Sequence, residues 1–155
     1  MVIPLLEAID IAGKTITADA LLTQRKLASY LLERNADYVF TVKGNQPILR
    51  EDIRLIFEGR EKPDFSEPLI LAHGRIEQRS IWTSTALNDY LDFPRVGQVF
   101  VIERPTIEKT TGETSSETVY GVTSHPPATA SAAAILAFNR DHWTVENSCH
   151  YILDW

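Results

Sequence analysis

Four side chains able to bind a metal ion or move a proton recur at every fourth position near the C-terminus, namely His142, Glu146, His150 and Asp154. The alanine-rich residues 130–134 just before them favour a helix. Residues four apart lie on one face of a helix, so we expect these side chains to form a single polar column. Glu146 borders the apolar arc of that helix and could reach a half-buried site, although amphipathic helices without chemistry show the same spacing.

One alternative is a transition-metal site made by His142, Glu146 and His150. Successive members would be about 6 Å apart along the helix axis, which is too far for three ligands to converge on one zinc ion with bonds of about 2 Å. The spacing also differs from the His-Glu-x-x-His zinc pattern. Glu146 is therefore interpreted as a single carboxylate that needs an acidic partner elsewhere in the chain.

The composition is typical of a globular chain with one hydrophobic core. Its 155 residues are 44% hydrophobic, and no stretch approaches the roughly 20 apolar residues that span a bilayer. The N-terminus lacks the basic region of a signal peptide, and a single cysteine, Cys149, excludes an internal disulfide framework. Both features favour the cytoplasm. The net charge of −6 argues against a general nucleic-acid binder, although local basic patches could still bind phosphate.

The elements that must position Glu146 and its partner begin with a βαβ unit. Lys14–Asp19 and Asp37–Lys43 are runs of β-branched and apolar residues that predict strands, and Gln24–Arg34 between them has helical spacing. The two strands should be parallel, with a right-handed crossover. A third segment, Pro47–Phe57, predicts another helix.

Polar residues follow both predicted strands. Asp19 ends the first strand, and Lys43, Asn45 and Gln46 come at the end of the second. Ligands of open α/β sheets gather at the carboxyl ends of the strands, so these residues are candidates for a binding site. A turn into the next helix would explain Asn45 and its neighbours equally well.

The helical periodicity disappears after residue 59. Residues 60–125 contain several short β-branched runs, which predict an antiparallel meander or small sheet inserted between the βαβ unit and the last helix. Arg75 and Arg79 place positive charge on this insert, although charged residues also protect the edges of sheets from aggregation. We expect residues 126–155 to contain the C-terminal helix, capped by Thr129 or Ser131.

Asp19 and Glu146 could together hold a divalent metal ion if the last helix packs against the sheet near Asp19. Carboxylates are the preferred ligands of Mg²⁺, and two metal ions about 4 Å apart can catalyse phosphoryl transfer. Two carboxylates are few for two metal ions, so a further acidic residue is expected.

Five ordered motifs resemble the DDE-type insertion-sequence transposases of the H-repeat-associated protein family. They extend over almost the whole chain and are Thr15–Gln24, Asp37–Gln46, His73–Glu77, Glu117–Ser124 and His142–Asn147. The resemblance implies an α/β fold with a partial ribonuclease H-like core and a β-rich insertion before the last catalytic helix. It also implies cleavage of DNA at transposon ends, followed by strand transfer of the 3′-hydroxyl into target DNA.

The resemblance assigns roles to two acidic residues. Asp19 matches the second member of the family's acidic triad and Glu146 the third, which implies Mg²⁺ or Mn²⁺ as the cofactor. Related transposases carry an arginine four residues before the glutamate and a lysine seven after it, where this chain has His142 and Leu153. No counterpart of the family's first aspartate precedes Asp19. We therefore expect the C-terminal part of a transposase, inactive by itself.

DNA is the partner that the resemblance implies, as transposon ends and as target. The residues expected to contact DNA are Lys43, Asn45, Gln46, Arg75, Arg79, His142, Asn147 and His150. The chain is also expected to form a homo-oligomer or to pair with an intact transposase, and no membrane association is expected. The alternative function is a non-catalytic remnant that binds DNA or pairs with an intact transposase.

Overall fold

A computed structural model describes most of the 155 residues. The described ranges are 12–18, 25–42, 47–88, 90–91, 94–141 and 150–153. Side chains are described for residues 12–17, 27–42 and 47–139, apart from the gaps between these ranges. Within these ranges, none of the helices is both long and apolar enough to cross a bilayer.

The βαβ unit predicted from the sequence is confirmed. It consists of β1 (Thr15–Ala18), α2 (Arg25–Glu33) and β2 (Asp37–Val42), and the two strands are parallel, with Thr15 opposite Asp37. Helix α2 ends in a Schellman motif: the Ala36 amide donates to the Leu31 carbonyl oxygen at 2.9 Å, and Asn35 has a φ of 60°. This tight ending turns the chain directly into β2.

All the described strands belong to one sheet. Its hydrogen-bonded order is β3-β6-β7-β8-β2-β1-β9, and β5 pairs with both β4 and β7. The remaining bounds are α3 (Pro47–Ile56), β3 (Phe65–Ser66), β4 (Ile70–Ala72), β5 (Arg75–Glu77), β6 (Ser80–Ser84), β7 (Gln98–Glu108), β8 (Thr114–Thr123), α4 (Ala132–Asp141) and β9 (His150–Leu153). The predicted helix from residue 47 is therefore confirmed.

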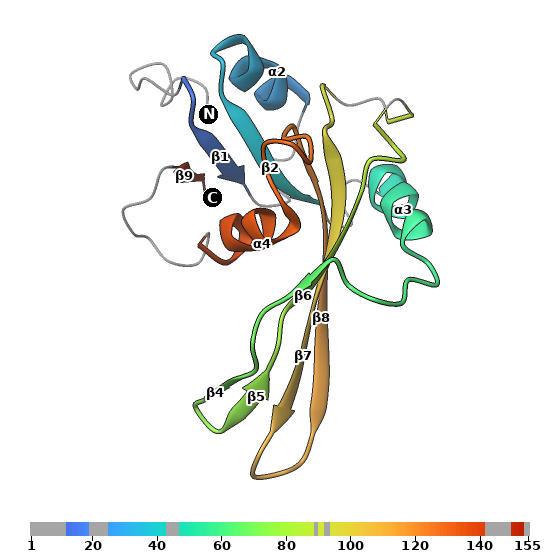
Figure 1. The fold of residues 1–155 in the computed structure, drawn as a ribbon, viewed down its shortest axis with the longest axis vertical. Coiled ribbons are helices and arrows are strands. Elements are labelled where there is room, and N and C mark those ends of the chain that lie inside the picture. The colour runs from blue at the N-terminus through green and yellow to red at the C-terminus, as the bar shows by residue number, and fades with distance from the viewer. Residues whose placement is uncertain are drawn as a thin grey trace.

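The sheet is covered on both faces by helices (Figure 1). On one face, α2 and α3 pack on side chains that alternate along β2, β7 and β8, including Tyr38, Val101 and Tyr120. On the other face, α4 packs its Ile135 and Leu136 against residues of the same strands. Strand β2 is thus buried on both sides, as its nearly continuous apolar sequence indicated.

The β-rich segment is antiparallel, as predicted, and it is continuous with the strands of the βαβ unit. Strand β8 pairs antiparallel with β2, from Val39 opposite Thr123 to Val42 opposite Tyr120. The inner halves of β7 and β8 are buried because both of their faces carry apolar side chains that the helices cover. The segment therefore continues the sheet begun by the βαβ unit.

The outer parts of these strands form an arm that projects from the body (Figure 1). We define the arm as residues 68–79 and 103–118, which comprise β4, β5 and the distal halves of β7 and β8. Residues 114–118 of β8 are all exposed, as are all residues of β4. No described helix covers the arm, so its strands meet solvent on both faces.

The prediction of the C-terminal helix is partly wrong. Its start is confirmed, because the Ser131 hydroxyl oxygen accepts a hydrogen bond from the Ala134 amide at 3.2 Å and α4 begins at Ala132. The helix ends at Asp141, and residues 150–153 form β9, which runs parallel to β1. His150 therefore does not extend a helical column. Tyr151 and Ile152 favour strands. A strand at this position also pairs with the main-chain groups on the open edge of β1, which a helix would leave unpaired.

Candidate functional site

Most of the predicted site residues lie outside the described parts of the chain. These are Asp19, Lys43, Asn45, Gln46, His142, Glu146 and Asn147. For His150 the structure gives the backbone alone, at the first position of β9, where it is paired with Thr15. Arg75 and Arg79 are both described, and they lie on the arm.

The strands that precede Asp19 and Lys43 are described. Strand β1 ends at Ala18 and the parallel strand β2 ends at Val42, with Ala18 paired to Phe40. The two strands are direct neighbours that point the same way, so the main chain leaves both at the same edge of the sheet. The sequence prediction that these two polar segments start from one sheet edge is consistent with this pairing.

Arg79 lines a hollow between the arm and α4, with a volume of about 640 Å³. Its other lining residues are Ile102, Arg104, Glu117, Thr118, Val119 and Asn139. The lining combines apolar side chains with guanidinium, carboxylate, hydroxyl and amide groups. This combination suits a ligand with an anionic group and a flat apolar surface, such as a nucleotide segment.

The two arginines of this hollow differ in their charge environment. The Arg104 guanidinium donates to the Glu117 carboxylate at 2.7 Å and lies 4.0 Å from that of Glu77, so its charge is already neutralised. Among the described residues, no carboxylate lies within ion-pair distance of Arg79. Arg79 is half-buried. Arg79 is therefore the cation of the hollow that is best placed to accept a phosphate.

Arg75 lies at the tip of the arm. It follows the turn His73-Gly74, in which both residues have positive φ angles of 53° and 74°. Such a turn is the type I′ hairpin geometry, and the Lys109 amide donates to the Gly74 carbonyl oxygen at 2.8 Å, which ties the β4-β5 hairpin to the β7-β8 turn. The tip thus presents the exposed side chains of His73, Arg75 and Lys109 together.

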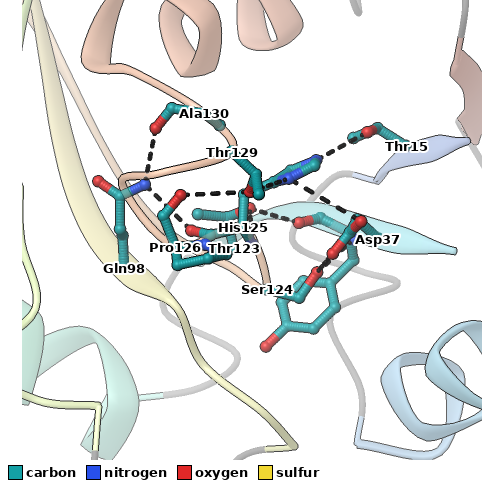
Figure 2. Close-up of polar contacts among 10 residues, drawn as sticks. Thr15, Asp37, Gln98, Thr123, Ser124, His125, Pro126, Thr129 and Ala130 are labelled. Carbon is teal, nitrogen blue, oxygen red and sulfur yellow. Dashed lines mark hydrogen bonds and ion pairs between the residues drawn. The ribbon is translucent and has the colours of Figure 1, made fainter. Parts of the chain in front are cut away.

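A polar junction that the sequence analysis did not identify connects the core strands to α4 (Figure 2). The His125 ring lies between two threonines: Nε2 is 2.8 Å from Thr15 Oγ1, and Nδ1 is 3.0 Å from Thr129 Oγ1. The same Nδ1 lies 3.9 Å from a carboxylate oxygen of Asp37. The ring also stacks on Phe138, with centroids 5.9 Å apart. His125 thereby joins β1, β2 and α4.

The neighbouring side chains secure the backbone at this junction. The Ser124 hydroxyl donates to Asp37 at 2.8 Å and accepts from the Tyr38 amide at 2.9 Å. The buried Gln98 side chain donates to the carbonyl oxygens of His125 and Ala130, both at 3.0 Å. These bonds hold the connection between β8 and α4 against β7, and hence fix where α4 begins.

Serine, histidine and aspartate side chains meet at the junction, but their geometry does not suit nucleophilic catalysis. A catalytic serine must donate its proton to the histidine, whereas Ser124 donates to Asp37. Both His125 ring nitrogens already face threonine hydroxyls. The polar run Thr123-Ser124-His125 at the end of a strand was the one sequence signal for this cluster.

Burial raises the pKa of the Tyr38 phenol above its ordinary range, and the nearby Asp37 carboxylate raises it further. The phenol donates to the Pro94 carbonyl oxygen at 2.7 Å. It therefore stays protonated at neutral pH and acts as a structural donor next to the junction.

The family model of the transposase DDE domain matches residues 1–155. The chain belongs to the DDE transposase family. The resemblance found from the five sequence motifs is thus confirmed.

The relatives of this DDE transposase chain are longer than 155 residues. The "H repeat-associated putative transposase YhhI" of Escherichia coli K12 is 31% identical over 97% of this chain and 42% of its own length. A protein "in dhlA 3'region" of Xanthobacter autotrophicus is 34% identical over 78% of this chain and 42% of its own length. The chain spans about two fifths of the curated relatives it matches. No solved structure matches it.

DDE transposases generally use a divalent metal ion, so we asked which residues of this transposase chain could hold one. Among the described residues, no three His, Cys, Asp or Glu side chains gather in a metal-binding arrangement. The junction does not fit such an ion, because Asp37 is the one carboxylate beside His125 in the described part of the chain and already accepts a hydrogen bond from Ser124. A metal role for Asp19 and Glu146, which lie outside the described residues, is therefore a proposal.

Proposed function

We propose that the chain forms part of the catalytic unit of a DDE transposase, in which a ribonuclease H-like core cleaves and joins DNA. Asp19 and Glu146 would be ligands of Mg²⁺ or Mn²⁺ in the complete active site. Support comes from the family match over all 155 residues and from the parallel pairing of β1, the strand that directly precedes Asp19, with β2. A bound divalent ion would activate the attacking oxygen and stabilise the leaving oxygen of the phosphodiester.

The observation that carries a role in DNA binding is the hollow that Arg79 and Asn139 share. Arg79 belongs to the arm, and Asn139 belongs to α4, which ends at Asp141, five positions before Glu146. A DNA backbone bound in this hollow would contact the arm and the helix that leads towards the proposed catalytic glutamate. We propose that Arg79 binds a phosphate there and that Arg75, at the arm tip, contacts the same nucleic acid.

The junction at His125 would serve this function by orientation. It fixes the start of α4 relative to β1 and β2, through contacts with Thr15 and Asp37. Asp19 follows β1, and Glu146 follows α4 in sequence. We propose that the junction holds β1 and α4, which precede the two acidic residues in the sequence, in a constant relation.

The catalytic proposal predicts no cleavage by the 155-residue chain itself, because two carboxylates are too few to hold two metal ions. Purified chain incubated with transposon-end DNA and Mg²⁺ or Mn²⁺ should release no nicked product. A longer relative that supplies a third acidic residue should cut, and replacing the counterparts of Asp19 or Glu146 with amides should abolish its cutting. Cleavage by the 155-residue chain, or unaffected cutting by the amide variants, would contradict the assignment.

The DNA-binding proposal is tested by the salt dependence of affinity. Arg79→Gln should weaken binding of a short duplex by roughly threefold to tenfold in about 0.1 M salt and reduce the slope of log K against log salt by about 0.9, since one phosphate contact is lost. Glu117→Gln should strengthen binding, because it releases Arg104 from its ion pair.

Arg50→Gln is the matched control for this experiment. Arg50 is an exposed residue of α3, its guanidinium lies 5.2 Å from the centre of the Tyr120 ring, and it belongs to the sheet face opposite α4. Its loss removes the same charge without touching the hollow. Equal weakening by the Arg50 and Arg79 variants would show that binding follows net charge and would refute the hollow as the DNA site.

A further inference from the structure

The arm has no hydrophobic core of its own. All of its residues, 68–79 and 103–118, are described, and no apolar side chain among them is buried. A region with so few buried apolar contacts bends and opens at little cost in free energy. The orientation of the arm relative to α4 therefore depends on contacts at its root, where Ser80, Glu103 and Thr118 lie opposite one another on β6, β7 and β8.

One ion pair at this root joins the arm to the body. The Arg60 guanidinium pairs with the Glu103 carboxylate, and the two side chains are only 22% and 32% exposed. The ion pairs of Arg104 with Glu77 and Glu117 connect residues of the arm to one another. In the part of the chain that the structure describes, the pair of Arg60 and Glu103 is thus the ion pair that fixes the arm to residues outside it.

Arg60 is itself held in place by the body. It follows Gly59, whose φ of 75° turns the chain after α3, and its Nη1 donates to the Phe57 carbonyl oxygen at 3.1 Å. Its guanidinium carbon lies 5.1 Å from the centre of the Trp82 ring, a cation–π contact. Phe57 and Trp82 both belong to the core on the face of α2 and α3. Glu103 is therefore paired with a cation whose position this core fixes.

The ion pair lies directly behind the hollow, on the other face of the sheet. Successive side chains of a strand point to opposite faces, so Val101 and Glu103 of β7 belong to the face of α2 and α3, whereas Ile102 and Arg104 line the hollow. A displacement of β7 at Glu103 would therefore move both of these lining residues relative to Asn139, which lines the hollow from α4.

We propose that Arg60 and Glu103 form a strut that sets the angle of the arm and thereby the width of the hollow. Both are positioning residues, because they lie on the sheet face opposite the proposed DNA and contact no phosphate. Their effect on affinity rests on the proposed binding of DNA in the hollow, whereas their effect on the arm is measurable without DNA. Since the pair is partly shielded from solvent, salt screens it less than an exposed pair.

Binding of a short duplex separates this positioning role from an effect of charge. Arg60→Gln and Glu103→Gln change the net charge in opposite directions, yet each breaks the strut, so both should weaken binding. The expected loss is roughly twofold to fivefold, because apparent affinity falls with the fraction of chains whose arm is correctly placed. The slope of log K against log salt should stay at its wild-type value, since no phosphate contact is lost.

Two single variants are matched controls. Arg50→Gln removes another guanidinium that lies over an aromatic ring on the same face, and it should weaken binding less than Arg60→Gln does. Glu117→Gln removes a carboxylate of the arm that faces the hollow, and it should strengthen binding. If Glu103→Gln strengthened binding as well, its effect would be one of charge and the strut would be refuted.

The double variant Arg60→Gln/Glu103→Gln keeps the net charge and leaves neither charge without its partner. Circular dichroism should show the wild-type fold in this variant. Its loss of affinity should be about that of one single variant, because the two residues act as a unit. Losses that add up to the sum of the single variants would contradict a shared role.

The distance between spin labels on the arm and on the body reports the orientation without DNA. Ser116 of the arm and Glu33 of α2 are exposed, and both can be replaced by cysteine in a Cys149→Ser background. Double electron–electron resonance should give a narrow distance distribution in the labelled parent chain and a broader or shifted one when Glu103→Gln or the double variant is added. An unchanged distribution would overturn the strut. A broader distribution in a chain whose duplex binding ignores Arg79 would support the strut and refute the proposed DNA site.

Discussion

Gly97→Ala is expected to lower the free energy of unfolding by roughly 3 kcal/mol, at the upper end of what overpacking usually costs. A Cβ atom at this position would lie 2.4 Å from the His125 carbonyl carbon and 2.6 Å from the Pro126 nitrogen. These are main-chain atoms, so no change of rotamer can make room for the methyl group. The Gly97 amide also donates to the Thr123 carbonyl oxygen at 2.8 Å, which holds the two segments at this close approach.

Thermal unfolding followed by circular dichroism should show this loss as a fall in Tm of roughly 10 °C, since 1 kcal/mol corresponds to about 2–4 °C at this chain length. Gly112→Asn is a suitable control, because Gly112 has a φ of 73° with open space around it and asparagine tolerates that region. An unchanged Tm for Gly97→Ala would mean that the segment around His125 is free to move, contrary to the junction described above.

The second large effect concerns Gly121 and the aromatic ring above it. Gly121 lies directly opposite Phe100, and a Cβ there would come within 2.1 Å of the ring. Phe100 is fully buried beneath α4, so its ring cannot swing into solvent. We expect Gly121→Ala to cost about 3 kcal/mol of unfolding free energy, through the displaced ring.

A double-mutant cycle separates this clash from a general loss of sheet stability. Phe100→Leu alone should destabilise the chain by removing buried apolar volume. In the double variant, the smaller leucine leaves room for the methyl group that Gly121→Ala adds, so the combined loss should be at least about 1 kcal/mol less than the sum of the single losses. Urea unfolding of the four proteins measures this coupling. Strictly additive losses would argue against direct contact between the two side chains.

The local elements could be predicted because their signals are local. The β-branched run after Gly13 and the apolar run from Asp37 predicted β1 and β2, and Leu27 and Leu31 gave α2 its helical spacing. Ser131, which caps α4, was one of the two residues predicted as its cap. In each case residues within a few positions of one another decide the conformation, through propensity, capping or periodicity.

The pairing of β8 with β2, which joins the two parts of the sheet, could not be predicted from local patterns. The pairing of β8 with β2 depends on the burial of Val39 and Val122 on opposite faces of the sheet. That burial is complete only when α2 and α3 have packed on one face and α4 on the other. The strand β9 was missed for a related reason. Its residues follow an alanine-rich helix, and only the open edge of β1 favours a strand there.

The candidate site, too, could be predicted from the sequence only in part. Residue types and family motifs indicated Arg75 and Arg79 as candidates. They could not show that Glu117 pairs with Arg104, whereas Arg79 has no carboxylate partner among the described residues. The junction was missed because its members come from five separate segments. Thr15 and His125, for example, are 110 positions apart in the sequence, and no local spacing links them.

The pairing of β2 with β8 also sets an order for folding. The Thr123 hydroxyl donates to the Tyr38 carbonyl oxygen across 85 positions of sequence, so β2 gains its second neighbour only after residue 123 has been synthesised. Contacts of such long separation form slowly, because the intervening loop must close first. Until then, β8 and α4 do not yet cover the apolar side chains of β2. The hairpin of β7 and β8 has its strands close in sequence and can form early. This hairpin is therefore expected to fold first and to present, at residues 120–123 of β8, the edge on which β2 docks.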